Sequence, residues 1–252
     1  YSGYKFIEEL ASNAQGRLGQ RTAVIRLRLD DGKEVEMDAE FITNMRTGAA
    51  GALGLKYFAS QAKSIAILGT GKISKALALC SAELGVPRIN IYSRSPENRE
   101  KFKTELNHLP MEFILHDSAP SAVSDAEAIL TAVPTPEPVL FFKDLPANVF
   151  ISAMGGDSRT SQLDKEIMLG ATIVPDNEDQ CQKSGEFKAA LEDGYYDKIN
   201  FAKFNGRTAN IGDAALDKLN LAGGVKVAYF TGLAVQDINA AKMVYQRFVN
   251  QF

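Results

Sequence analysis

Short apolar runs recur along the middle of the chain and alternate with segments of helical character. The runs that predict strands cover residues 64–68, 88–92, 111–115, 128–132, 148–153 and 171–174. Residues 73–84 and 96–106 predict two of the helices between them. Apolar strands that alternate with helices are typical of a parallel sheet covered on both faces. We therefore predict an α/β fold, a Rossmann-type doubly wound parallel sheet with six such strands.

The regions on either side of this alternation show other patterns. Residues 22–29 and 33–37 alternate with a period of two around a turn at 30–32, which predicts a β-hairpin. Residues 41–62 predict a helix with small residues at 48–51, which let a backbone or a ligand come close. Residues 177–194 are largely helical in character, and 211–219 predict a short helix. Residues 225–230 predict a strand and 238–249 a helix, neither of which need belong to the parallel sheet.

A glycine turn follows the first apolar strand and opens the first helix. Its residues are Gly69, Thr70, Gly71, Lys72 and Ile73. In a dinucleotide-binding turn the first glycine makes the bend and the second lets the backbone approach the pyrophosphate, which lies on the helix N-terminus. Ser74 stands where the third glycine of that pattern would be, so the motif is also compatible with a plain turn after a buried strand.

Ligands of open parallel sheets bind at the carboxyl ends of the strands, which adds further candidate cofactor-binding residues. These are Ser93, Arg94 and Ser95 after the second strand, Ala132, Val133, Pro134 and Thr135 after the fourth, and Met154 and Gly155 after the fifth. An acidic residue after the second strand suits the ribose hydroxyl of NAD, whereas an arginine suits the 2′-phosphate of NADP. We therefore favour NADP(H), with NAD(H) as the alternative if Arg94 is only a solvated residue.

Composition and charge narrow the range of partners. The 252 residues carry a net charge of −3, which provides no basic surface for nucleic acid. No run approaches the roughly 20 apolar residues that cross a bilayer, so we expect no membrane association and a cytoplasmic location. Cys80 and Cys181 are far apart and predict buried free thiols. His108 and His116 are not spaced as metal ligands, so we expect no metal.

Two charged residues outside the strand ends are candidates for substrate chemistry. Arg46 lies in the small-residue helix, where its guanidinium could bind a carboxylate with two hydrogen bonds, although an ordinary surface arginine fits equally well. Asp237 follows the loop 231–233 near the start of the last helix, where a carboxylate either stabilises the helix dipole or takes part in catalysis.

Three sequence blocks together resemble one protein family. They are Arg46-Thr-Gly-Ala-Ala50, Ile67-Leu-Gly-Thr-Gly71 and Phe230-Thr-Gly-Leu-Ala-Val-Gln-Asp237, and residues 131–135, 176–180 and 184–186 provide further matches. On these blocks the chain resembles the ornithine cyclodeaminase/mu-crystallin family over nearly its whole length. The sequence departs from the more frequent family pattern at residues 155–160, and at Lys72 and Ser74, where the family varies.

The resemblance implies a division of the chain and a role for several residues. Residues 61–221 would form the Rossmann domain, and residues 1–60 and 222–252 a discontinuous α+β substrate and dimerisation domain, so a homodimer is expected. Lys5 and Arg46 would contact the substrate carboxylate, Thr47 would contact the phosphate region of the cofactor, and Asp237, assisted by Lys5, would act as acid and base. Family members carry further strand and helix units before this point, so we expect an N-terminal truncation.

The resemblance also implies the class of reaction. Family members transfer hydride between a nicotinamide and the carbon of an amine or imine, and the substrate would be a small amino or imino acid. Arg94 fits members that consume NADPH, so we predict a ketimine or imino-acid reductase or amino-acid dehydrogenase. The alternatives are a cyclodeaminase lyase with tightly bound NAD and a non-catalytic NADPH-binding protein of the crystallin kind.

Overall fold

The computed structural model describes residues 1–9, 21–219 and 221–251, which form two compact units. The first unit contains residues 1–46 and 232–252, and the second contains residues 47–231. Helix α1 (Glu40–Phe58) contributes residues to both units. No helix in these described stretches combines the length and the apolar character that crossing a membrane requires.

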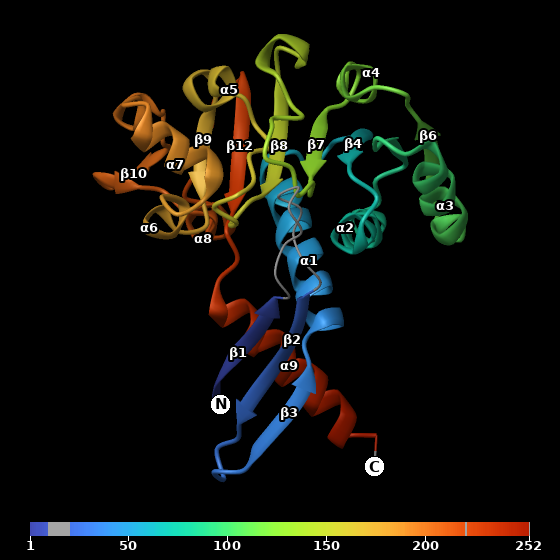
Figure 1. Cartoon of the computed structure of the whole chain (residues 1–252), viewed down its shortest axis with the longest axis vertical. Helices are drawn as coiled ribbons and strands as arrows, with labels where there is room; N and C mark the ends of the chain where they lie inside the picture. The colour runs from blue at the N-terminus through green and yellow to red at the C-terminus, as the bar shows by residue number, and fades with distance from the viewer. Residues whose placement is uncertain (10–20, 220, 252) are drawn as a thin grey trace. The chain divides into compact units, whose positions relative to one another are not determined.

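The second unit is built on a seven-stranded parallel sheet in the order β6-β5-β4-β7-β8-β12-β9. Figure 1 shows β9, β12, β8 and β7 side by side in that order. The strands are β4 (Ser64–Leu68), β5 (Arg88–Tyr92), β6 (Glu112–Leu115), β7 (Ala128–Thr131), β8 (Val149–Met154), β9 (Thr172–Pro175) and β12 (Val225–Phe230). The chain winds outward from β4 to β6 and then returns to β7, so the strand order reverses between β4 and β7. This topology confirms the predicted Rossmann-type fold.

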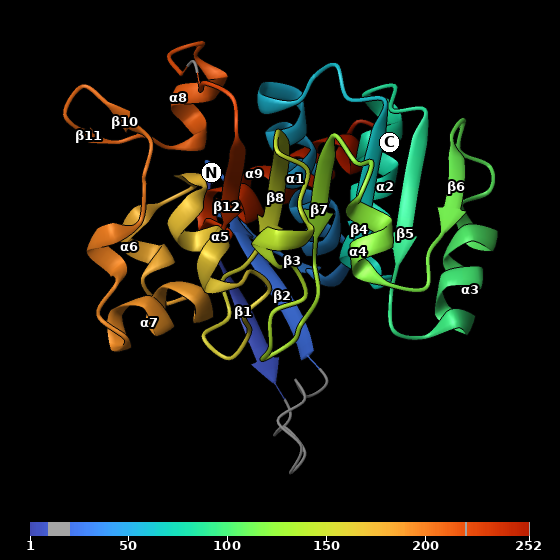
Figure 2. The same ribbon diagram turned by 90° about the horizontal axis from the view of Figure 1, so that it is seen from above.

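Both faces of this sheet are covered because successive side chains of each strand point to opposite sides. Ile65 and Ile67 of β4 pack with α2 (Lys72–Glu83), α3 (Pro96–Leu106) and the second half of α1. Ala66 and Leu68 pack with α4 (Ala119–Val123), α5 (Lys165–Gly170) and α7 (Gly185–Glu192) on the other face. Helices α7 and α3 lie at opposite ends of the sheet (Figure 2). Burial on two faces explains why these strands are continuously apolar.

Three parts of the second unit differ from the sequence prediction. The strand at 225–230, expected with the flanking domain, is β12 and pairs with β8 and β9 inside the parallel sheet, which therefore has seven strands. The helical stretch at 177–194 is two short helices, α6 (Glu178–Cys181) and α7, because Ser184 begins a new helix. Residues 203–208 form a small hairpin, β10 (Lys203–Phe204) and β11 (Arg207–Thr208), that was not predicted. The remaining elements are η1 (Phe142–Asp144), η2 (Tyr196–Lys198) and α8 (Ile211–Ala215).

The first unit is a three-stranded antiparallel sheet with a helix on one face. Its strands are β1 (Ser2–Glu9), β2 (Arg21–Arg28) and β3 (Glu34–Asp38), in that order. Helix α9 (Ala234–Val249) packs Ala241 against Ile25 and Ile42. The β2–β3 hairpin was predicted, and Gly32 makes its turn with a φ of +83°. Strand β1 was not predicted, because Tyr4 and Phe6 are exposed on its outer face. The sequence pattern predicts no element over residues 1–19, of which residues 10–19 lie outside the described residues.

The small residues of α1 allow close helix packing in the second unit. A side chain on Gly48 would approach the backbone carbon of Ala76 in α2 to 2.6 Å, closer than carbon atoms can pack. At Gly48, the segment that comes close to the small residues 48–51 is therefore the backbone of α2.

Replacing Gly48 by alanine tests this packing. Helix propensity alone would stabilise the variant by about 1 kcal/mol, whereas the clash with Ala76 should destabilise it by about 1–3 kcal/mol. Denaturant unfolding of Gly48→Ala should therefore show a lower free energy of unfolding. The exposed neighbour Ala49 supplies the control, since Ala49→Ser should change stability by less than about 0.5 kcal/mol. A more stable Gly48→Ala protein would contradict this packing.

Candidate functional site

The glycine turn between β4 and α2 has the geometry that a pyrophosphate requires. Gly69 has a φ of +102°, a conformation that favours glycine, and its N–H donates to the Tyr92 carbonyl at 2.8 Å. Gly71 precedes the first residue of α2 and provides no side-chain cap to the helix, and a side chain there would meet nothing within 4 Å. Open space next to Gly71 at the N-terminus of a helix without a side-chain cap fits a dinucleotide phosphate. Thr70 lies in this turn, and Lys72 and Ile73 are the first two residues of α2.

Ser74 takes the place of the third glycine without disturbing the turn. Its side chain is fully buried, and a Cβ on Gly69 would lie 3.0 Å from its hydroxyl oxygen. The hydroxyl therefore uses the space that Gly69 leaves free.

The loop after β5 presents an exposed guanidinium between two hydroxyls. Arg94 is exposed, and the Ser95 hydroxyl accepts the Asn98 N–H at 3.2 Å as the N-terminal cap of α3. A residue that the sequence did not single out holds this loop: buried Arg99 donates to the Ser93 carbonyl and to the Asp117 carboxylate, both at 2.6 Å. The arrangement can accept a phosphate group next to Arg94.

The loops after β7 and β8 are joined by one buried side chain. The Gln162 amide oxygen accepts the Val133 N–H at 2.8 Å and the Thr131 hydroxyl at 2.9 Å, and its amide nitrogen donates to the Met154 carbonyl at 2.7 Å. Because β7 and β8 are neighbours in a parallel sheet, both loops lie at the same edge as the glycine turn. The candidates at the ends of these strands are therefore brought together: Ala132, Val133, Pro134 and Thr135 after β7, Met154 as the last residue of β8, and Gly155 after it.

The first unit contains a buried cluster of charges from three distant segments. The Asp237 carboxylate accepts from Lys5 Nζ at 2.7 Å and from Arg46 Nε at 2.9 Å, and all three side chains are at most 14% exposed. Gln236 accepts a second hydrogen bond from Arg46, at 3.3 Å. The residues come from β1, α1 and α9, so three candidates that the family resemblance implied contact one another. Thr47, the next residue of α1, is half-buried.

Burial and the neighbouring charges set the protonation of this cluster. Burial lowers the pKa of the Lys5 ammonium, the hydrogen bond to Asp237 raises it and the nearby Arg46 lowers it, so that the net pKa lies below its ordinary value. A lysine with a lowered pKa exchanges protons more readily near neutral pH. Arg46 has N–H donors beyond the two bonded to Asp237 and Gln236, and such a fork suits a carboxylate.

The sequence also missed a second layer of buried polar residues in the second unit. Glu186 of α7 accepts the Gln162 N–H at 2.6 Å and the hydroxyl hydrogen of Tyr229 in β12. Asp176, after β9, accepts the Thr231 N–H at 2.9 Å. Positions 176 and 186 matched the family pattern in sequence, but only their burial and hydrogen bonds show what they contact.

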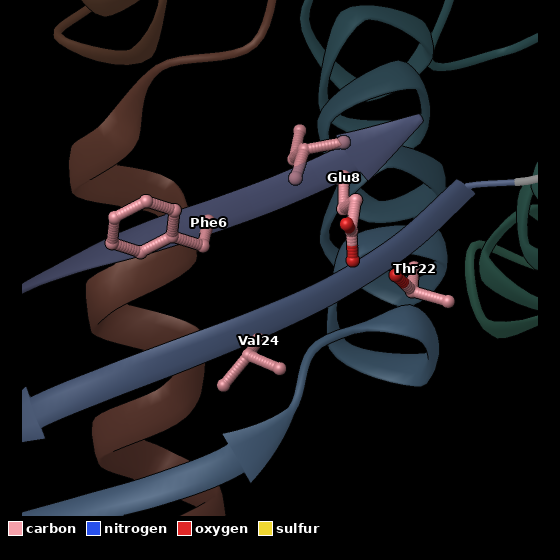
Figure 3. A pocket seen from close by; sticks show the side chains of 5 residues that line it. Phe6, Glu8, Thr22 and Val24 are labelled. Carbon is pink, nitrogen blue, oxygen red and sulfur yellow. The ribbon is translucent and has the colours of Figure 1, made fainter. Parts of the chain in front are cut away.

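Other features of the described residues do not add a site. Figure 3 shows a hollow on the three-stranded sheet lined by Phe6, Ile7, Glu8, Thr22 and Val24, none of which is a candidate residue. No cluster of metal-ligating side chains occurs in the part of the chain that the structure describes. Cys80 and Cys181 are free, and burial raises the pKa of both thiols.

A family model covers almost the whole chain. The description of that model is the ornithine cyclodeaminase/mu-crystallin family, and it matches residues 1–251. The chain belongs to this family. The identification made from the three sequence blocks is thereby confirmed.

Several named proteins are similar to the chain along most of its length. Delta(1)-pyrroline-2-carboxylate reductase of Bacillus cereus is 26% identical over 99% of the chain and 78% of its own length. Alanine dehydrogenase of Archaeoglobus fulgidus is 24% identical over all of the chain and 78% of its own length. Ketimine reductase mu-crystallin of Rattus norvegicus is 27% identical over 83% of the chain and 63% of its own length.

Solved structures share the fold. A Delta(1)-pyrroline-2-carboxylate reductase of Thermococcus litoralis, in complex with NADH and L-proline, superimposes with a TM-score of 0.84 at 23% identity, over 98% of the chain and 78% of its own. An archaeal alanine dehydrogenase dimer with bound NAD gives the same TM-score at 24% identity, over 99% of the chain and 78% of its own.

The charge cluster predicts how the pKa of Lys5 responds to a mutation. In Asp237→Asn the carboxylate that raises this pKa is gone, while burial and Arg46 still lower it, so the pKa should fall further. Titration of the lysine amines by heteronuclear NMR measures this change. The exposed Lys33, which pairs with Asp31, is the internal control and should titrate unchanged. A Lys5 pKa that rises in the variant would show that Asp237 does not act on it as described.

Proposed function

We propose that the chain is a nicotinamide-dependent reductase of the C=N bond of a cyclic ketimine or imino acid, with the reverse amino-acid dehydrogenation as its equilibrium partner. The predicted class of activity, an oxidoreductase of the ornithine cyclodeaminase type, is confirmed at the level of the family and its named relatives. The observation that carries the specific proposal is the buried cluster of Lys5, Arg46 and Asp237. Its chemistry suits a substrate with a carboxylate and a basic nitrogen.

Each member of the cluster has a proposed role. The Arg46 guanidinium binds the substrate carboxylate, which fixes the orientation of the carbon to be reduced. Asp237 lies beside the substrate nitrogen as acid and base, and Lys5, whose pKa is lowered by burial, shares the proton with it. Lys5 also contacts the substrate carboxylate in this proposal. Without substrate, the Asp237 carboxylate lies within 2.9 Å of the Lys5 and Arg46 cations. When the substrate binds, contacts to its carboxylate and nitrogen must therefore replace some of these ion-pair contacts.

The proposed cofactor is NADP(H), with NAD(H) as the alternative. A nicotinamide cofactor, when bound, supplies the hydride for the reduction. The glycine turn at residues 69–73 would hold the pyrophosphate of the cofactor. Its 2′-phosphate would be bound by Ser93, Arg94 and Ser95. The loops after β7 and β8 would hold the nicotinamide half. Thr47 is proposed for the phosphate region. Relatives with solved structures hold NADH or NAD, so the preference for NADP(H) rests on the exposed Arg94 alone.

The organisation of the protein is also proposed. We infer that both ends of the chain form a substrate and dimerisation domain and that the protein is a cytoplasmic homodimer without nucleic-acid or membrane partners. Tyr4 and Phe6 support dimerisation, since two aromatic rings are exposed on the outer face of β1, with centroids 5.3 Å apart. An archaeal relative is a dimer.

A cyclodeaminase reaction is the second candidate. It is supported by the L-lysine cyclodeaminase of Streptomyces rapamycinicus, 31% identical over 66% of the chain and 50% of its own length. The two reactions differ in their balance, because a reductase consumes one reduced cofactor for each imine. A cyclodeaminase returns the hydride and releases ammonia. Following nicotinamide absorbance with 1-pyrroline-2-carboxylate, and ammonia release from ornithine or lysine, therefore decides between them.

Substituting Asp237 distinguishes an enzyme from a protein that only binds the cofactor. Asp237→Asn should lower kcat by about 100-fold or more because the acid and base is lost, while NADPH affinity changes little. Imine-dependent oxidation of NADPH and equilibrium binding measure the two quantities. The exposed carboxylate Asp31 is a control, and Asp31→Asn should keep full activity. Full activity of Asp237→Asn would contradict the proposed role.

Substituting Arg94 tests the cofactor preference. Arg94→Asp removes a charge-assisted contact to the 2′-phosphate and adds a repulsive carboxylate, so NADPH should bind about 10–100-fold more weakly. Affinity for NADH should change by less than about threefold. Lys101, an exposed cation of α3, supplies the control substitution Lys101→Asp. An unchanged preference for NADPH in Arg94→Asp would overturn the assignment.

A further inference from the structure

A buried hydrogen-bond network connects three strand ends of the second unit to α7. Glu186 is 3% exposed and accepts the N–H groups of Gln162 at 2.6 Å and Leu163 at 3.4 Å. Its second carboxylate oxygen accepts the hydroxyl hydrogen of Tyr229, which is fully buried. No cation takes part in these bonds, so the carboxyl group acts here as an acceptor for three donors.

Gln162 extends this hydrogen-bond network to the ends of β7 and β8. Its amide oxygen accepts from Thr131 and Val133, and its amide nitrogen donates to the Met154 carbonyl. Gln162 is 1% exposed and Thr131 is fully buried, so the Thr131 hydroxyl would lose its partner inside the protein if the amide moved. A buried polar group without a partner is costly, and the bonds therefore fix the ends of β7 and β8 relative to each other.

Tyr229 contacts the loop after β8 and restricts its position. Its hydroxyl lies so close to Gly155 that any side chain at position 155 would overlap it. The Gly155 N–H donates to the Phe230 carbonyl of the same strand, β12, at 2.9 Å. The position of Gly155 is thus set by the ring that Glu186 holds.

The two loops tied by this network lie on one side of the point where the strand order reverses. A dinucleotide binds across that point, with its adenosine ribose near the end of β5. Its nicotinamide half would then be held by the residues at the ends of β7 and β8. The adenosine side has a separate support, Arg99, which bonds to the Ser93 carbonyl and to Asp117.

We propose that Glu186, acting through Gln162 and Tyr229, is a positioning residue that fixes the loops 132–135 and 154–155 for the nicotinamide half of the cofactor. This inference rests on the proposed function for its ligand. Its structural part, the immobilisation of the two loops, holds with or without a cofactor. Glu186 itself touches neither cofactor nor substrate in this proposal and has no catalytic role.

The test compares Glu186→Ala with the conservative Glu186→Gln and with Tyr229→Phe. An amide oxygen at position 186 can still accept from the Gln162 N–H, so Glu186→Gln should bind NADPH within about threefold of the native protein. Glu186→Ala should bind NADPH about tenfold more weakly, while adenosine 2′,5′-bisphosphate, a probe of the adenosine side alone, should change by less than about twofold. Tyr229→Phe removes only a hydroxyl, so it should weaken NADPH binding by less than Glu186→Ala does and leave the affinity for adenosine 2′,5′-bisphosphate within about twofold.

Hydrogen exchange of the cofactor-free protein gives the second readout. Amides in 132–135 and 154–155 should exchange faster in Glu186→Ala, and those in 93–95 should not. Asp213→Ala serves as a stability control, because Asp213 of α8 bonds to Arg207 and Asn210 and to no member of the network. This variant should have a lower melting temperature, but its affinity for NADPH should not fall relative to its affinity for adenosine 2′,5′-bisphosphate.

Three results would overturn the inference. The first is that Glu186→Ala weakens the binding of NADPH and of adenosine 2′,5′-bisphosphate equally. The second is that Asp213→Ala also weakens NADPH binding about tenfold and leaves bisphosphate binding unchanged. The third is that hydrogen exchange in both loops is unchanged in Glu186→Ala. A native protein that binds neither NADPH nor NADH would refute the proposed function. Exchange in the two loops would then decide the positioning role alone.

Discussion

The charge balance around Asp237 is the constraint on which the first unit depends. A carboxylate that is 5% exposed must have cationic or hydrogen-bonding partners, and Lys5 and Arg46 supply them from segments 232 and 191 residues away. Removing Asp237 would leave the Lys5 and Arg46 cations buried without their shared counter-charge, so the three positions constrain one another. The same balance prepares the chemistry, because it joins a guanidinium suited to carboxylates with an amine whose pKa is lowered.

The second unit meets a different constraint, the burial of a parallel sheet on both faces. Apolar side chains satisfy it along the strands, but the strand ends also carry backbone groups that need hydrogen-bond partners. Gln162 and Glu186 satisfy these groups after β7 and β8, and Arg99 does so after β5. Buried polar side chains thus support the loops in which the candidate cofactor residues lie, while the exposed Arg94 remains available to a ligand.

Local pattern predicted most of the elements and failed where pairing decided the outcome. Strands β4 to β9 were recognisable because burial on both faces makes them continuously apolar. Strand β1 was missed because the apolar residues Tyr4 and Phe6 are on its exposed face, so its sequence lacks the usual alternation of buried apolar and exposed polar residues. The hairpin at 203–208 was missed although Asn205-Gly206, both with positive φ, is a strong turn signal. The place of β12 between β8 and β9 could not be predicted, because strand order depends on long-range hydrogen bonds.

The sequence by itself determined the fold class, the glycine turn and, through three blocks of residues, the family. It also supplied Lys5, Arg46 and Asp237 as candidates, yet it left the surface and helix-dipole readings of Arg46 and Asp237 open. Only the tertiary structure joined the three side chains into one buried cluster and assigned contacts to Gln162, Glu186 and Arg99. The physical reason is that burial and hydrogen bonding between distant segments are properties of the packed chain. Residue type and spacing specify which groups exist, and packing decides which of them meet.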